Sequence, residues 1–286
     1  MSTEPDIPLT SGAQLAHAET LLAAAGSLAP REEAIALLSA LLSTSPALLR
    51  AKPGRRLSQQ SVATFAGWVA RRAAGEALPH ITGRLPFMGL ELVVGQNDPL
   101  PAPSAWRLLE AALQIARYHA PGDLLAADIG TGCGATALAL AAFEPRFTRV
   151  YAVESSVAAL EVAAANGARY LLNLIISWLA GEGLDSVPEP VDVVVCSQLE
   201  PSTPAAARLL EQAPAKLRPG GALVCALDQL PSTEFSALLE RTLPTAQVWS
   251  ELHPGGAILV AQLPPAATGD TTFNSGDSRA TLGGKW

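Results

Sequence analysis

Three glycines at alternating positions form the stretch of this sequence best suited to hold a small ligand. They are Gly130, Gly132 and Gly134, and they separate an apolar segment from one rich in Ala and Leu. Glycine lets the backbone approach a ligand closely, and the first N–H groups of a helix are free to bind it. A dinucleotide-binding turn would carry its third glycine where this chain has Ala135. The spacing therefore disfavours a nicotinamide dinucleotide enzyme, and a strand-to-helix turn without a ligand is the simpler alternative.

A carboxylate follows at the end of the next predicted strand. Residues 149–153 form that strand, and Glu154 comes directly after it. A carboxylate there can accept a hydrogen bond from each hydroxyl of a ribose, and bonds to a charged acceptor are the stronger kind. A solvated acid at a strand end is the alternative. Because Glu154 stands one strand–helix unit after the glycine turn, the two features together favour ligand binding.

The elements that must position these groups alternate along the second half of the chain. Apolar runs that predict strands are followed by Ala/Leu-rich runs with helical spacing. The predicted strands are 124–129, 149–153, 192–196, 222–227, 247–252 and 257–263, and the predicted helices between them include 157–169, 205–217 and 235–241. This alternation predicts an α/β fold with a mostly parallel sheet and helices on both faces.

The first half of the chain has a different pattern. Apolar residues recur at helical spacing from 11 to 75, and prolines divide this region into segments. Residues 85–94 predict two short strands around a glycine turn, and 104–119 predict a further helix. We therefore expect four parts: a helical domain over 11–78, a β-hairpin linker over 79–103, a sheet domain over 104–263, and a polar, disordered tail over 264–286.

Composition and charge narrow the class of protein. The chain has 286 residues, 49% of them hydrophobic, which excludes a wholly disordered protein. Its net charge of −7 argues against direct binding of nucleic acid, which needs clustered Lys and Arg. The first half has two small basic groups: Arg50, Lys52, Arg55 and Arg56, and then Arg71 with Arg72. We interpret them as solvated helix ends, with a docking patch for an acidic partner as the alternative.

The cysteines and histidines give no sign of a metal centre. Cys133, Cys196 and Cys225 lie far apart without a CxxC pair, and the four histidines lack metal-ligand spacing. A sparse, odd number of cysteines fits a reducing compartment. No apolar run approaches the ~18 residues that span a membrane, and the acidic start of the chain does not resemble a secretory signal. We therefore expect a cytoplasmic protein with no metal and no membrane association.

The glycine turn resembles motif I of the class I S-adenosylmethionine-dependent methyltransferases. This resemblance implies a Rossmann-like, seven-stranded sheet and S-adenosylmethionine as the cofactor. It also implies contacts from the acid after the second strand, from an acid beside the adenine, and from the start of the loop after strand 192–196. The candidate cofactor-binding residues are then Asp128, Gly130, Thr131, Gly132, Cys133, Gly134, Glu154, Glu182 and Ser197.

A more specific resemblance lies in the linker. Residues 71–83, which read RRAAGEALPHITG, and residues 86–90, which read PFMGL, closely resemble the linker and hairpin of the release-factor glutamine methyltransferases. The likeness covers about residues 12–263. It implies a helical substrate-docking domain joined to a methyltransferase domain. It also implies a peptide chain release factor as the partner, with methyl transfer to the side-chain amide nitrogen of one of its glutamines.

The sequence departs from that family at the position of its catalytic motif, Asn-Pro-Pro-Tyr. The four residues that follow strand 192–196 here are Ser197, Gln198, Leu199 and Glu200. The family's Pro-Arg-Pro-Glu-Thr-Glu stretch is replaced by PAPSAW at 101–106. An amide nitrogen is a poor nucleophile because its lone pair is delocalised, so the family relies on an Asn oxygen and a proline-held carbonyl to orient it. Losing one such positioned group costs about 10²–10³ in rate.

Two hypotheses follow from these departures. The first is a methyltransferase of the release-factor type with a divergent catalytic loop. The second is a non-catalytic paralogue that binds the cofactor or a protein partner without methyl transfer. Glu200 could serve as a base toward a different acceptor, although a solvated loop acid is the simpler interpretation. A carboxylate beside a sulfonium would stabilise the reactant more than the transition state.

Overall fold

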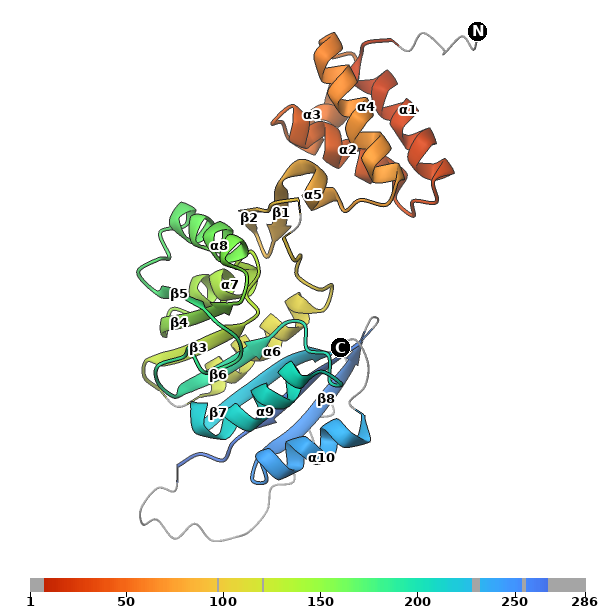
Figure 1. Cartoon of the computed structure of the whole chain (residues 1–286). Coiled ribbons are helices and arrows are strands. Elements are labelled where there is room, and N and C mark those ends of the chain that lie inside the picture. Colours follow the sequence, from red (N-terminus) through yellow and green to blue (C-terminus); the bar gives the residue numbers. More distant parts are fainter. Residues whose placement is uncertain (1–7, 97, 120, 228–231, 254–255, 267–286) are drawn as a thin grey trace.

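The computed structural model describes residues 8–96, 98–119, 121–227, 232–253 and 256–266. A helical domain lies at one end of the molecule and a sheet domain at the other, with a short hairpin between them (Figure 1). Most of the predicted disordered tail lies outside the described residues. Within the described ranges, no helix combines the length and the apolar character needed to cross a membrane.

Five helices make up the first domain: α1 (Ser11–Ala24), α2 (Pro30–Leu41), α3 (Pro46–Ala51), α4 (Gln59–Ala73) and α5 (Leu78–Thr82). The side chains of Thr10, Ser45 and Ser58 cap α1, α3 and α4 by accepting a backbone N–H of the first turn. Apolar side chains from these helices form one core around Phe65. Ile81 of α5 belongs to the same core, so the helical domain continues to the start of the hairpin.

The linker contains the predicted hairpin, with β1 (Arg84–Phe87) antiparallel to β2 (Leu90–Val93). Met88 and Gly89 make the turn, and both have a positive φ, of 50° and 82°. A two-residue hairpin turn of this kind favours positive φ because its twist then matches that of the strands.

The sheet has seven strands in the order β5-β4-β3-β6-β7-β9-β8. They are β3 (Leu124–Ile129), β4 (Phe147–Glu154), β5 (Ile176–Ala180), β6 (Val191–Cys196), β7 (Leu217–Leu227), β8 (Gln247–His253) and β9 (Gly256–Gln262). Strands β3 to β7 are parallel to one another, and β9 is antiparallel to both of its neighbours, β7 and β8. The mostly parallel α/β prediction is therefore confirmed. The sequence pattern did not single out β5, a half-buried edge strand whose apolar run is interrupted by Ser177.

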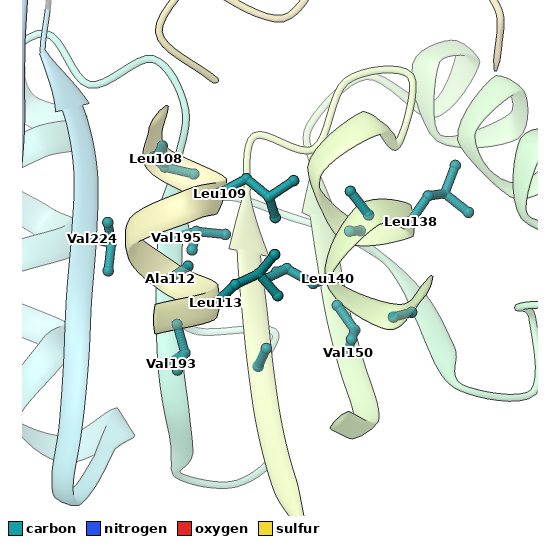
Figure 2. Packing of buried hydrophobic residues seen from close by; sticks show 14 of the residues in the cluster. Leu108, Leu109, Ala112, Leu113, Leu138, Leu140, Val150, Val193, Val195 and Val224 are labelled. Atoms are coloured by element: carbon teal, nitrogen blue, oxygen red, sulfur yellow. The ribbon is translucent and has the colours of Figure 1, made fainter. Parts of the chain in front are cut away.

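Five helices cover the sheet: α6 (Ala105–Tyr118), α7 (Ala135–Phe143), α8 (Val157–Arg169), α9 (Pro204–Lys216) and α10 (Thr233–Thr242). Neighbouring strand residues alternate between two cores, so Val193 and Val195 pack with α6 and α7 while Val194 packs with α9 and α10. Figure 2 shows the first core, where leucines of α6 and α7 meet valines of β4, β6 and β7. Parallel sheets are usually buried on both faces, as this one is. Because β3, β4 and β6 are parallel, their carboxyl ends lie at one edge of the sheet.

Candidate functional site

The glycine turn connects β3 to α7, and its three glycines all have backbone angles that disfavour other residues. The φ values of Gly130, Gly132 and Gly134 are 72°, 55° and 87°. A Cβ on Gly134 would lie 3.1 Å from both Ala163 Cβ and Trp178 Cη2. A Cβ on Gly130 would meet nothing within 4 Å. The turn is therefore packed tightly on the side of α8 and open at its first glycine, as a backbone cradle for a ligand would be.

Asp128 is the last-but-one residue of β3 and is completely buried. Its Oδ2 accepts hydrogen bonds from Thr131 Oγ1 at 2.7 Å and from the Ala137 backbone N–H at 3.0 Å. Its Oδ1 has no hydrogen-bond partner among the described residues. Burial raises the pKa of Asp128 from its ordinary 3.8 to about 6, against the opposing effect of the Thr131 hydrogen bond. The carboxyl group thus ties the turn to α7 and keeps one acceptor oxygen free.

Glu154, at the end of β4, reaches across to the glycine turn. Its Oε2 accepts the Gly132 N–H at 3.0 Å, and its Oε1 accepts the Ser156 N–H at 3.0 Å. The residue is only 8% exposed. The sequence predicted ribose contacts for this carboxylate, and the structure adds a brace to the turn that the sequence did not indicate. A carboxylate oxygen can accept more than one hydrogen bond, so this brace leaves capacity for a ligand.

A shallow hollow lies against the glycine turn. Its far side is formed by residues 99–101 of the linker, and the Pro99 carbonyl oxygen lies 3.3 Å from where a Cβ on Gly132 would stand. The hollow is lined by Pro99, Leu100, Pro101, Gly130, Thr131, Gly132, Cys133, Ala135, Thr136, Ser197 and Gln198. Five of the nine predicted cofactor-binding residues line it directly.

The four residues after β6 divide into two pairs. Ser197 and Gln198 line the hollow, and Gln198 Nε2 donates a hydrogen bond to the Leu100 carbonyl at 3.3 Å. Leu199 is buried in the core beneath α9 and α10. Glu200 is exposed, and its Oε1 accepts the Ser202 hydroxyl at 3.4 Å in the turn before α9. Only the first pair is therefore placed to meet a ligand in the hollow.

Glu182 lies beyond β5 at the same edge of the sheet but away from the lining of the hollow. Its side chain is 73% exposed, and Arg208 of α9 lies 3.9 Å away. Its contact with an adenine stays a prediction. Among the residues that the structure describes, no three His, Cys, Asp or Glu side chains gather as a metal site would require.

Asn166 of α8 is a positioning residue that sequence reasoning missed. It is fully buried, and its Nδ2 donates to the carbonyls of Cys133 at 3.0 Å and Val93 at 2.9 Å. Its Oδ1 accepts the Val93 N–H at 2.8 Å. One side chain thereby joins the linker hairpin to the glycine turn. The sequence could have indicated this role, because Asn166 is a polar residue at helical spacing from Ala159 and Ala163, on the buried face of an Ala-rich helix.

The donor set fits an adenosyl amino acid. S-adenosylmethionine, the cofactor that the sequence resemblance implies, carries positive charge on its sulfur and its amino group. This charge favours a site with buried carboxylates. Asp128 Oδ1 is an acceptor without a partner among the described residues, Glu154 is a second acid at the turn, and Gly130 leaves its side of the turn open. A bound cation beside Asp128 would favour the charged form of its carboxyl group, which burial disfavours.

This fold and this site define a class I methyltransferase domain. The family model of the PrmC N-terminal domain matches residues 13–83, and that of the methyltransferase small domain matches residues 109–267. The release factor glutamine methyltransferase of Xylella fastidiosa (strain Temecula1) is 34% identical over 229 residues, which cover 71% of this chain and 82% of that protein. The chain belongs to the release factor glutamine methyltransferase family.

Other relatives match over a shorter length. The release factor glutamine methyltransferase of Koribacter versatilis is 37% identical over 148 residues, which cover 52% of each chain. This match thus spans about half of that relative. Among solved structures, the 16S rRNA N2 G1207 methyltransferase of T. thermophilus has a TM-score of 0.50 and 20% identity, with 63% of this chain and 49% of that chain covered. That likeness supports the fold, and the family matches support S-adenosylmethionine as the cofactor.

Proposed function

We propose that this chain transfers a methyl group from S-adenosylmethionine to the side-chain amide nitrogen of a glutamine in a peptide chain release factor. The observation that carries the proposal is a single hollow with two kinds of lining. The glycine turn, with Asp128 and Glu154 behind it, forms one side, and Ser197 and Gln198 reach it from the next strand. Because release factors act in translation, the proposal also places the chain in the cytoplasm.

The cofactor half of the site is assigned to groups that hold a cation and a ribose. When bound, the cofactor supplies an electrophilic methyl group on a positively charged sulfur. The open side of the turn at Gly130 admits the ligand next to the backbone. Asp128 Oδ1 offers a buried acceptor to a cationic group, and Glu154 accepts ribose hydroxyls while it continues to hold the Gly132 N–H.

The acceptor half of the site is assigned to Gln198. An amide nucleophile must be oriented before it can attack, and the family uses an amide oxygen for this. Gln198 also carries an amide, and its bond to the Leu100 carbonyl uses the Nε2 donor. The Oε1 acceptor of Gln198 is then the group that can receive an N–H of the substrate glutamine at the hollow.

A transfer assay with purified release factor tests the proposal. The full chain is incubated with methyl-labelled S-adenosylmethionine and each bacterial class of release factor, and the modified residue is located by mass spectrometry. We expect label on a glutamine, at a rate about 10²–10³ below that of a relative with an intact Asn-Pro-Pro-Tyr motif. A release factor with that glutamine replaced by Asn is the matched control. No label, where the intact relative labels fully, would contradict the proposal.

The second candidate function is a non-catalytic paralogue, and the loop after β6 favours it. Leu199 is turned into the core and Glu200 into the turn before α9, so the prolines that hold the family's loop have no counterpart here. This candidate predicts cofactor binding by calorimetry together with no transfer to any release factor. Measurable transfer would exclude it.

A further inference from the structure

The two halves of this chain differ in net charge. Residues 1–78 contain seven Lys and Arg against six Asp and Glu, whereas residues 79–286 contain 12 Lys and Arg against 20 Asp and Glu. An acidic molecule that approaches the protein is therefore repelled by the sheet domain much more than by the helical domain. Charge asymmetry of this kind steers association and selects orientation.

Ion pairs within residues 8–78 leave three cations together in one loop. The four acidic residues described in this range are paired with arginines: Glu19 with Arg31, Glu32 with Arg50, Glu33 with Arg72, and Glu76 with Arg71. The remaining cations are Lys52, Arg55 and Arg56, and they form no ion pair with any described residue. All three lie in the loop between α3 and α4.

The same loop and the end of α3 line an open surface hollow. Leu48, Ala51 and Pro53 supply apolar lining, and Lys52 and Arg55 supply charge. Leu48 is 41% exposed although it is a large apolar side chain. An apolar lining edged by cations that have no ion-pair partner among the described residues matches a partner segment that carries carboxylates around an apolar side chain.

The backbone of this loop is held rigidly against α1. Ser11 Oγ donates to the carbonyls of Lys52 and Pro53 at 3.1 Å, and the Ser11 N–H donates to the Arg55 carbonyl at 2.8 Å. A Cβ on Gly12 would lie 2.9 Å from Pro53 Cβ, so the two segments are in close contact. A loop that is already ordered loses little entropy when a partner binds.

We propose that the loop of residues 52–56 and its hollow are the surface on which the helical domain docks an acidic segment of its protein partner. The inference rests on the proposed function, in which that partner is a release factor. Nucleic acid fits less well, because phosphate binding draws on many cations and these three stand beside apolar lining on a chain of net charge −7. The acidic sheet domain keeps the partner oriented with its acidic segment on this loop.

Binding kinetics with Arg55→Glu test the proposal. The probe is purified release factor, captured on a sensor surface, with the full-length chain in solution at low and at high salt. We expect Arg55→Glu to lower the association rate about tenfold at low ionic strength, with a smaller difference at 0.5 M salt. Arg241→Glu, the same charge reversal on α10, is the control and should bind as the unmodified chain does. Equal unfolding temperatures show that the loop variant remains folded.

The outcomes separate this inference from the proposed function. If the unmodified chain binds release factor and Arg55→Glu binds equally well, the docking surface is wrong while the proposed function stands. If the unmodified chain binds no release factor, both are overturned. If the chain instead binds a single-stranded RNA oligonucleotide in an Arg55-dependent way and release factor binding ignores Arg55, the loop is a nucleic-acid contact and the inference is wrong.

Discussion

The turn after β3 and the loop after β6 end neighbouring strands, since Ile129 pairs with Cys196, yet they differ in how they are built. The turn after β3 is a backbone structure of three positive-φ glycines, tied down by Asp128 and Glu154. The loop after β6 depends on side chains, with Gln198 at the hollow and Leu199 in the core. Under the proposed function, cofactor binding and methyl transfer therefore rest on different kinds of support within one hollow.

This difference predicts which of the two regions tolerates substitution. A side chain at Gly134 would collide with α8 and would also strain the backbone, so change there costs stability. Exposed positions such as Gln198 and Glu200 can change without loss of the fold, because surface substitutions usually shift stability by less than about 0.5 kcal/mol.

The largest effect is expected for Gly134→Ala. The new Cβ would be 3.1 Å from Ala163 and Trp178 in a backbone with φ of 87°, so both packing and backbone strain oppose it. We expect a loss of about 2–4 kcal/mol in the free energy of unfolding, measured by urea denaturation. Gly130→Ala is the matched control, because its Cβ meets open space and only the backbone strain remains, about 1 kcal/mol. Equal losses in both variants would contradict the packing argument.

A second effect concerns the pH dependence of stability. The folded state raises the pKa of Asp128 to about 6 from 3.8, so folding disfavours its ionised form. Its contribution to stability is therefore full below pH 4 and is lost as pH rises to about 6, by about 3 kcal/mol. Asp128→Asn should remove this decline and raise stability at pH 8 by about 2 kcal/mol, while it weakens cofactor binding. A variant less stable than the unmodified chain at pH 8 would contradict this account of burial.

Glu154→Gln should lower cofactor affinity about tenfold, or about 1.4 kcal/mol. The amide oxygen can still accept the Gly132 N–H, so the turn stays braced, while the negative charge and the acceptor for the Ser156 N–H are lost. Isothermal titration calorimetry with S-adenosylhomocysteine measures it, and the unfolding temperature serves as the control for structure. Unchanged affinity would show that Glu154 braces the turn without contacting the ligand.

The smallest effect on stability is expected for Gln198→Ala, within about 0.5 kcal/mol of the unmodified chain. Its side chain is exposed and makes one hydrogen bond, to the Leu100 carbonyl. Under the proposed function this variant should keep its cofactor affinity and lose methyl transfer by about 10²-fold. Retained transfer would remove Gln198 from the acceptor half of the site.

Much of the fold could be predicted because it follows from local pattern. Strand and helix alternation predicted the sheet, and the glycine spacing placed a ligand turn at its edge. Contacts between distant segments left no such pattern. Three hydrogen bonds of the site join residues 22, 73 and 98 positions apart. They connect Glu154 with Gly132, Asn166 with Val93, and Gln198 with Leu100. Short or edge elements, such as α3, α5 and β5, have too few residues to show a period.

Calorimetric titration of the full-length chain with S-adenosylmethionine tests most directly whether the glycine turn at the end of β3 binds the cofactor. The account predicts saturable binding of one cofactor per chain, weaker below pH 6 as Asp128 becomes neutral and weaker in Glu154→Gln. Absence of measurable heat at any pH, confirmed by equilibrium dialysis with labelled cofactor on folded protein, would contradict it.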